Sequence, residues 1–272
     1  MNEQLTVPNE PPRAAADGLS IRSVPTEHGW RWLVSGWQLF LKSPGVWLGI
    51  TVVLLIAMML IGTVPMLGTL AIAFLMPVAA AGMMLGCQAL EQGGELRFDH
   101  LFAGFHRQTG NLVVVGVWSL VGHAVIGAVV VAIGGGAVLS GVMSGAMFGA
   151  GPGALLALGG MMVAMLVGTV LLVPLAMALW FAPALVVFSG LTPGAALKAS
   201  FDGCMKNMAP FLIYGILLFI LLLVALIPIM LGVLLLIPVL TGSVFASYGD
   251  IYRQDSPPAP SEAASAPSAA SA

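Results

Sequence analysis

Three long stretches of the chain contain no Asp, Glu, Lys or Arg: residues 43–90, 108–197 and 207–249. Each is far longer than the roughly 20 apolar residues that cross a bilayer as one helix. They lack the strict alternation of polar and apolar positions that is typical of barrel strands. Only helices satisfy their own backbone hydrogen bonds in lipid, so the pattern predicts an all-α chain that crosses the membrane several times.

Composition supports the same class of protein. Hydrophobic residues make up 59% of the chain and charged residues only 7%, whereas a typical soluble domain has about 25% charged residues. So little charge cannot cover the surface of a water-soluble globule. We therefore interpret the chain as an integral membrane protein.

The distribution of basic residues predicts the number of spans. All nine Lys and Arg residues lie in four polar segments that flank the three uncharged stretches. The positive-inside rule places these segments in the cytoplasm, so each uncharged stretch crosses an even number of times. Turns at 65–68 and around Pro228 divide the first and last stretches. The predicted spans there are 46–64, 69–90, 211–227 and 230–249.

The middle stretch is rich in glycine and admits two interpretations. A span at about 112–133 is clear, and Pro174 is expected to kink the segment at 155–188. We predict a polytopic bundle of six spans, with eight as the alternative. Both termini are then cytoplasmic. Residues 1–25 and 254–272 have the composition of disordered tails, and they flank a membrane domain at 26–253.

Three segments that precede apolar runs share a pattern of small, aromatic and basic residues: SGWQLFLKSP (35–44), AGFHRQTGN (103–111) and ASFDGCMKN (199–207). Each has the periodicity of an amphipathic helix. Such a helix lies in the headgroup plane, with its apolar side in the acyl chains and its basic residues near anionic lipid. The residues expected to make these contacts are Arg31, Trp37, Lys42, Phe105, Arg107, Phe201 and Lys206.

These segments predict an internal repeat. Each repeat would consist of one interfacial helix and one transmembrane hairpin, so three copies give six spans. The copies would extend over about 26–90, 91–188 and 189–253. This count agrees with the one from the basic residues.

The sequence GVMSGAMFGAGPG places glycine at four-residue intervals, at Gly141, Gly145, Gly149 and Gly153. This spacing forms a groove in which another helix backbone can pack closely. Because Gly151-Pro152-Gly153 is expected to end the helix, a helix at 137–150 would be only about 21 Å long and too short to span. We favour a short outer helix packed on its neighbours, and a re-entrant segment that lines a cavity is the alternative.

Candidate chemistry is sparse. His123 is the deepest ionisable side chain in a predicted span apart from Cys and Tyr, and it is a candidate intramembrane polar site. We favour a neutral His that is hydrogen-bonded to a neighbouring helix. The sequence has no phosphate-binding loop, nucleophile elbow or zinc motif, and Cys87 and Cys204 lack metal spacing. We expect no enzyme activity, cofactor, metal or nucleic acid.

The segments GWRWLVSGWQLFLKSPGVWLGI, LGCQALEQGGELRFDHLFAGF and ALKASFDGCMKNMAPFLIYGI resemble a family of uncharacterised inner-membrane proteins of Gram-negative bacteria. The resemblance extends over about 28–252. It implies a multi-pass protein of the cytoplasmic membrane, and it supplies no catalytic residues. The glycine-rich insert at 134–160 departs from the family pattern.

Two functional classes fit these observations. The first, which we favour, is a non-enzymatic membrane organiser or assembly partner, because amphipathic helices without a polar pathway suit lateral contacts. Its partners would be the bilayer, anionic headgroups and another membrane protein or a second copy. The second is a small transporter or permease component, which the repeats and the prolines near spans favour. Its solute would be neutral or apolar.

Overall fold

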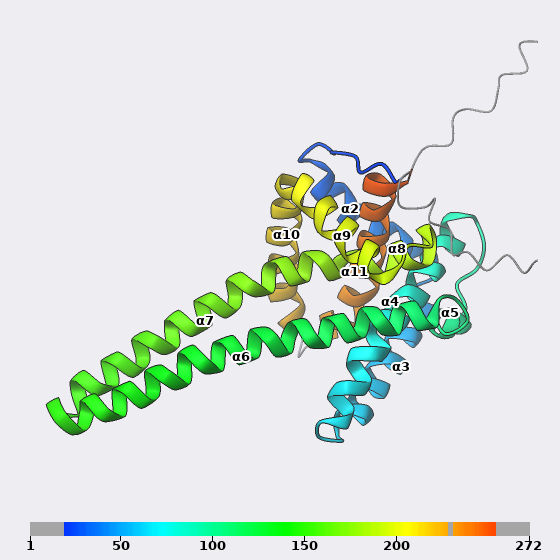
Figure 1. Cartoon of the computed structure of the whole chain (residues 1–272). Coiled ribbons are helices and arrows are strands. Elements are labelled where there is room, and N and C mark those ends of the chain that lie inside the picture. The colour runs from blue at the N-terminus through cyan, green and yellow to red at the C-terminus, as the bar shows by residue number, and fades with distance from the viewer. Residues whose placement is uncertain (1–18, 228–230, 254–272) are drawn as a thin grey trace, which may run out of the picture.

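The computed structural model describes residues 19–227 and 231–253, and this part of the chain is helical throughout its regular structure (Figure 1). Six of its helical segments are long and apolar enough to cross a membrane. This confirms the predicted all-α fold with six spans. The helices are α2 (His28–Lys42), α3 (Pro44–Gly62), α4 (Leu67–Glu91), α5 (Asp99–Ala103), α6 (Thr109–Phe148), α7 (Ala150–Trp180), α8 (Ala182–Ser189), α9 (Pro193–Lys206), α10 (Met208–Leu226) and α11 (Leu231–Tyr252).

The hairpins α3–α4 and α10–α11 begin and end within three residues of the predicted spans. Proline marks the start of two helices. Pro44 opens α3, and Pro193 opens α9 after Thr192. Proline suits the first turn because its missing N–H has no helical partner there and its φ is already helical.

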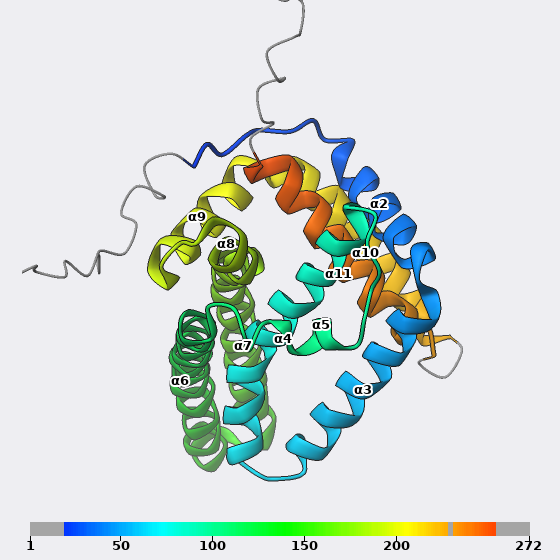
Figure 2. The same ribbon diagram turned by 90° about the vertical axis from the view of Figure 1, so that its right-hand side faces the viewer.

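Helix α2 packs antiparallel along α11, and it also contacts α10 (Figure 2). The two helices approach closely because their contact residues are small. A Cβ on Gly36 would overlap the Val239 carbonyl and lie 2.7 Å from the Ser243 nitrogen. On either side of this crossing, Trp32 and Phe245 are almost fully buried. The buried core extends from this crossing to α3, α4 and α8.

Helices α6 and α7 form a long hairpin that leaves the bundle in a direction of its own (Figure 1). Helix α6 runs without a break for 40 residues, which is a length of about 60 Å. The prediction of a separate helix at 137–150 is therefore wrong. The chain reverses at Gly149, whose φ of 99° favours glycine, and Pro152 is accepted in the first turn of α7.

Small residues line the contact between α6 and α7. Gly141 faces the Gly153 carbonyl and Ala157, and Gly153 lies against Gly145. Further toward the bundle, Gly160 meets Ala137. Three of the four predicted glycines thus join α6 to α7, whereas Gly149 forms the turn. A zipper of small residues allows the two backbones to pack closely in lipid.

The break between α7 and α8 is filled by a side chain from α9. Pro183 in the first turn of α8 cannot continue a straight helix. The buried Ser200 hydroxyl accepts a hydrogen bond from the Phe181 N–H at 2.9 Å and donates one to the Met177 carbonyl at 2.6 Å. It therefore stands in place of the helical bond between these two residues. A side chain inserted in this way bends a helix.

The repeat organisation stays a prediction. A shorter helix precedes each long hairpin in chain order, as the repeat requires. However, α2, α5 and α9 have 15, 5 and 14 residues, and α6 has 40 where α3 has 19. The middle unit therefore differs from the other two in both of its parts.

The close contact between α6 and α7 at Gly141, Gly145 and Gly153, called the seam below, predicts that one added methyl group lowers the stability of the protein. In Gly141→Ala, the new Cβ would lie 2.6 Å from the Gly153 oxygen, so the helices must separate. We expect the free energy of unfolding to fall by about 1–3 kcal/mol. Thermal unfolding in detergent, followed by circular dichroism, measures this. Gly136→Ala on the same helix is the control, because a Cβ there meets nothing within 4 Å; an equal loss in both variants would contradict the seam.

The hairpin arrangement predicts which positions are reached from outside the cell. We expect Cys at the exposed positions Leu67 and Gly151 to react with a membrane-impermeant maleimide in spheroplasts. Cys at Lys198 should react only after permeabilisation, because α9 would lie on the cytoplasmic side. The native Cys87 and Cys204 are buried and give a low background. Labelling of position 198 in intact spheroplasts would show that the orientation is wrong.

Candidate functional site

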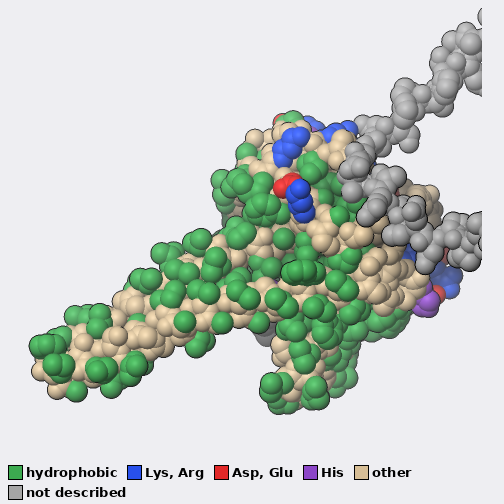
Figure 3. All heavy atoms as spheres, in the orientation of Figure 1, with side chains coloured by type: hydrophobic (Ala, Val, Ile, Leu, Met, Phe, Trp, Pro, Cys, Tyr) green, Lys and Arg blue, Asp and Glu red, His purple; other side chains and the backbone are tan. Residues whose placement is uncertain are grey.

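Charged side chains gather at one end of the molecule, away from the tips of the hairpins (Figure 3). The ends of α2, α4, α9 and α11 supply them, together with the segment at 92–108. This is the end that the positive-inside rule assigns to the cytoplasm. Because the rest of the described chain is apolar, this end is where the structure offers polar chemistry.

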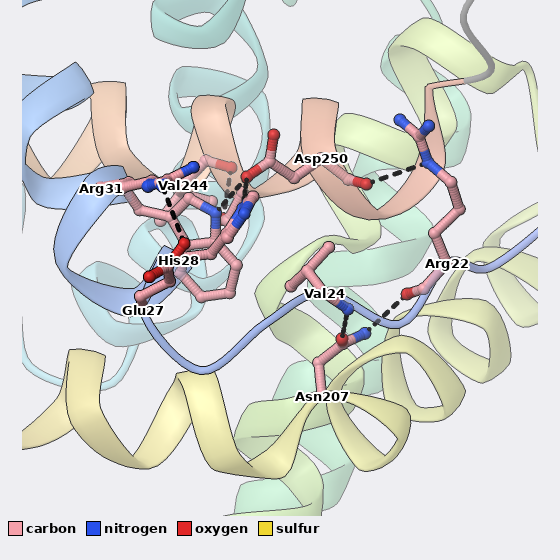
Figure 4. A network of polar contacts seen from close by, with 10 residues as sticks. Arg22, Val24, Glu27, His28, Arg31, Asn207, Val244 and Asp250 are labelled. Carbon is pink, nitrogen blue, oxygen red and sulfur yellow. Dashed lines mark hydrogen bonds and ion pairs between the residues drawn. The ribbon is translucent and has the colours of Figure 1, made fainter.

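Asp250, in the last turn of α11, connects α11 to α2 (Figure 4). One of its carboxylate oxygens lies 2.8 Å from His28 Nδ1 and accepts a hydrogen bond of 2.7 Å from Trp32 Nε1. His28 and Trp32 are four residues apart, so they share one face of α2. A carboxylate near a helix C-terminus is disfavoured by the helix dipole, and these two side chains offset that cost.

The segment that precedes α2 is held by the junction of α9 and α10. Asn207, which is buried, accepts a hydrogen bond from the Val24 N–H at 2.8 Å and donates one to the Arg22 carbonyl at 3.0 Å (Figure 4). Lys206 donates to the Ile21 carbonyl at 2.6 Å. Residues 19–25 therefore make defined contacts, although composition assigned them to a tail. Residues 1–18 and 254–272 lie outside the described residues.

The predicted lipid-contact residues of α2 lie on its outer surface. Trp37 is 45% exposed, and Arg31 is exposed and pairs with Glu27 at 2.7 Å. Lys42 donates to the Leu90 carbonyl at 2.9 Å. The neighbouring Trp30 is 58% exposed. These aromatic and basic side chains suit the boundary between acyl chains and headgroups.

The other two predicted segments also present large side chains outward. Phe105 and Arg107 are exposed in the turn between α5 and α6. On α9, Phe201 is half-buried and Lys206 is exposed. The structure thus leaves most of the predicted side chains accessible, but it does not bring the three segments together into one cluster. Their contact with lipid stays a prediction.

The inner face of α9 consists largely of small residues, which the sequence analysis missed. Its buried residues are Ala196, Ser200, Gly203 and Cys204. On α2, the small residues Gly29 and Gly36 share the inner face with large buried side chains such as Trp32 and Phe40. The predicted apolar stripes consist of large side chains, and some of these, such as Trp30 and Trp37, point outward. Small residues at i, i+3, i+4 and i+7 could have shown the packed face.

His123 lies on the exposed surface of α6, and its Nδ1 is 2.7 Å from the Ser119 carbonyl of the same helix. The prediction of a bond to a neighbouring helix is therefore wrong. The i−4 carbonyl was available without any partner helix. In the described residues, no three His, Cys, Asp or Glu side chains come together in a group that could hold a metal ion.

The two cysteines lie inside the protein and are not accessible from its surface. Cys87 and Cys204 are both buried and free. Burial raises the pKa of the Cys204 thiol to about 12, because an apolar environment disfavours the thiolate. The thiol therefore stays protonated at neutral pH, and the thiolate is the form that reacts or binds metal.

Two apolar grooves open on the sides of the bundle. The first, of about 670 Å³, is lined by α2, α10 and α11 and includes Trp30 and Trp37. The second, of about 610 Å³, is lined by α7, α9 and α10 and includes Trp180 and Tyr214. Both are bordered almost entirely by hydrocarbon and aromatic surface. Any small molecule that they accept must be correspondingly apolar.

The fold and the polar end define a multi-pass helical membrane protein. Over 208 aligned residues the chain is 32% identical to a probable inner membrane protein of Burkholderia thailandensis. The aligned region covers 74% of this chain and 76% of that protein. The chain belongs to this family of inner membrane proteins. No family model matches the chain, and no solved structure matches it.

The Asp250 network predicts a selective loss of stability. In Asp250→Ala, the Trp32 indole loses its acceptor in a part-buried position, and we expect the free energy of unfolding to fall by about 2–3 kcal/mol. Thermal unfolding with tryptophan fluorescence as the signal measures this loss. Asp99→Ala is the matched control, because its ion pair with Arg97 is exposed and worth less than about 1 kcal/mol. Equal losses would contradict a structural role for Asp250.

Proposed function

We propose that the protein is a non-enzymatic organiser of the inner membrane that assembles laterally with another membrane protein. The observation that carries this proposal is the α6–α7 hairpin, which projects from the bundle with apolar side chains exposed along it (Figure 3). An arm of this kind is suited to contacts within the bilayer.

The length of the hairpin decides how it can lie in the membrane. Helix α6 is about 60 Å long, whereas the hydrocarbon core is ~30 Å thick. An upright hairpin would expose Leu139, Met143 and Met147 to water. To stay within hydrocarbon, α6 must tilt by about 60°, well beyond the usual range. The tip therefore extends sideways, toward neighbouring proteins or lipids.

The base of the hairpin is fixed to the bundle. Leu112 and Val115 of α6 are almost fully buried. Gly116 lies against the Ala73 carbonyl and Phe74 of α4. The second helix of the hairpin, α7, packs on α9 through Ser200. An arm that is rigid along its length and held at its base can position a partner, because it loses little conformational entropy on binding.

The outer part of the hairpin offers apolar side chains with no partner in the described chain. They include Met147 at 75% and Leu158 at 63% exposure. Because lipid tails are as apolar as these side chains, burial alone gives no drive to associate. Close shape complementarity with another helix surface does, and the protein partner would be a second copy or a different membrane protein.

The grooves favour transport of a neutral or apolar solute as the second candidate function. The groove lined by α2, α10 and α11 is large enough for a drug-sized molecule. Its Trp30 and Trp37 lie on the helix that we expect in the headgroup layer. A transporter would hold its solute there and release it when the helices move.

Site-specific photo-crosslinking separates the two candidates. A photoreactive amino acid at Met147 or Leu158 should give a protein adduct of defined mass in native membranes. The same residue at Met59, a similarly exposed position on α3, should give several-fold less. Leu158→Lys should abolish the adduct at Met147, because a lysine in a lipid-buried interface is costly.

Coexpression of two differently tagged copies identifies the partner. An adduct that carries both tags shows a second copy, and an adduct with one tag shows another protein. The protein is also purified in native lipid and analysed by mass spectrometry. Equal crosslinking at Met147 and Met59, together with a small molecule held stoichiometrically, would contradict the organiser and favour transport.

A further inference from the structure

A polar cavity of about 380 Å³ opens between α2, α4 and α11 at the charged end of the molecule. Unlike the two grooves, it has as much polar as apolar lining. The side chains that line it come from four parts of the sequence: Arg22, Ser35, Gln38, Leu39, Lys42, Glu91, Phe245, Ala246, Asp250 and Arg253, with Gly249. None of the organiser contacts on the α6–α7 hairpin involves it.

The positions of these residues set the depth of the cavity in the membrane. Lys42 is the last residue of α2, directly before the span α3 begins. Glu91 is the last residue of the span α4, and Arg253 follows the last residue of α11. Three elements therefore pass from apolar span to polar loop at the cavity. This is the level of the lipid headgroups.

The charges of the cavity leave an excess of one positive charge. Arg22, Lys42 and Arg253 face the two carboxylates of Glu91 and Asp250. Arg253 pairs with Glu91 at 2.6 Å, and Asp250 accepts hydrogen bonds from α2. Lys42 donates to the Leu90 carbonyl, which neutralises no charge and uses one of its three N–H groups. Arg22 donates through its Nε to the Asp250 backbone carbonyl at 3.2 Å. Lys42 has no carboxylate partner among the described residues.

Two neutral polar groups lie beside Lys42. Ser35 and Gln38 line the cavity, and neither side chain has a hydrogen-bond partner within the part of the chain that the structure describes. Ser35 lies seven residues and Gln38 four residues before Lys42, so one face of α2 carries all three. Together they present an ammonium, a hydroxyl and an amide to the same space.

We propose that this cavity binds a phosphodiester monoanion, the chemistry shared by phospholipid headgroups and soluble phosphodiesters. A phosphodiester carries one negative charge and accepts hydrogen bonds through oxygen, which matches the single excess charge and the free donors. Charge-assisted hydrogen bonds of this kind are strong. The apolar Leu39 and Phe245 at the same cavity suit the glycerol end of a lipid headgroup.

Native mass spectrometry of the full chain in detergent tests the proposal. The delipidated protein is titrated with phosphatidylglycerol, and diacylglycerol, which lacks the phosphodiester, is the ligand control. We expect the wild type to retain phosphatidylglycerol and not diacylglycerol. Lys42→Gln should weaken retention about ten-fold, the usual effect of losing one charged hydrogen bond. Gln38→Leu breaks no described hydrogen bond, so it should weaken retention while leaving the melting temperature unchanged.

Lys198→Gln is the matched protein control, because Lys198 is an exposed cation at the same end that does not line the cavity. It should bind as the wild type does. Equal weakening in Lys42→Gln and Lys198→Gln, or no retention by the wild type, would overturn the proposal. Competition with soluble glycerophosphoglycerol identifies the source: displacement at equal concentration assigns a soluble phosphodiester, and resistance assigns the lipid.

Discussion

Close approach of helix backbones at small residues is the interaction on which the rest of this structure depends. Inside a bilayer the hydrophobic effect does not drive helices together, so contact area between well-fitted surfaces must do so. Gly36 provides this contact between α2 and α11, Gly116 between α4 and α6, and Gly141 with Gly153 between α6 and α7. The first two contacts join separate parts of the bundle, and the third holds the two helices of one hairpin together. The large apolar side chains are left free to face lipid.

The polar end adds direction to this packing. Asp250 receives hydrogen bonds from His28 and Trp32, and Asn207 pairs with the backbone of the segment before α2. Because a hydrogen bond has a fixed geometry whereas packing of small residues tolerates sliding, these contacts set the register of α2 against α9 and α11. They also keep the charged residues at one level, where the cavity beside Lys42 forms.

Much of the fold could be predicted from the sequence, because the cost of unpaired backbone groups in lipid leaves few alternatives. The stretches without charge predict where the spans lie, and the positions of the basic residues predict that each stretch crosses the membrane an even number of times. The glycine-rich middle could not be read in the same way. Gly151 and Pro152 mark a turn in either interpretation, and only packing against α7 shows that α6 continues to Phe148. The candidate site was harder still. Asp250, Ser200 and Asn207 act through partners far away in sequence, so no local pattern indicates them.

The hydroxyl of Ser200 has a geometric consequence for the arm that α7 supports. It occupies the place of a single backbone hydrogen bond between Met177 and Phe181, and beyond it α7 extends for about 45 Å. Over that lever, a rotation of about 10° at the serine moves the far end by about 8 Å, more than half the diameter of a helix. The Ser200 hydroxyl thus helps to set the direction in which the arm leaves the bundle, together with the contact of α6 with α4.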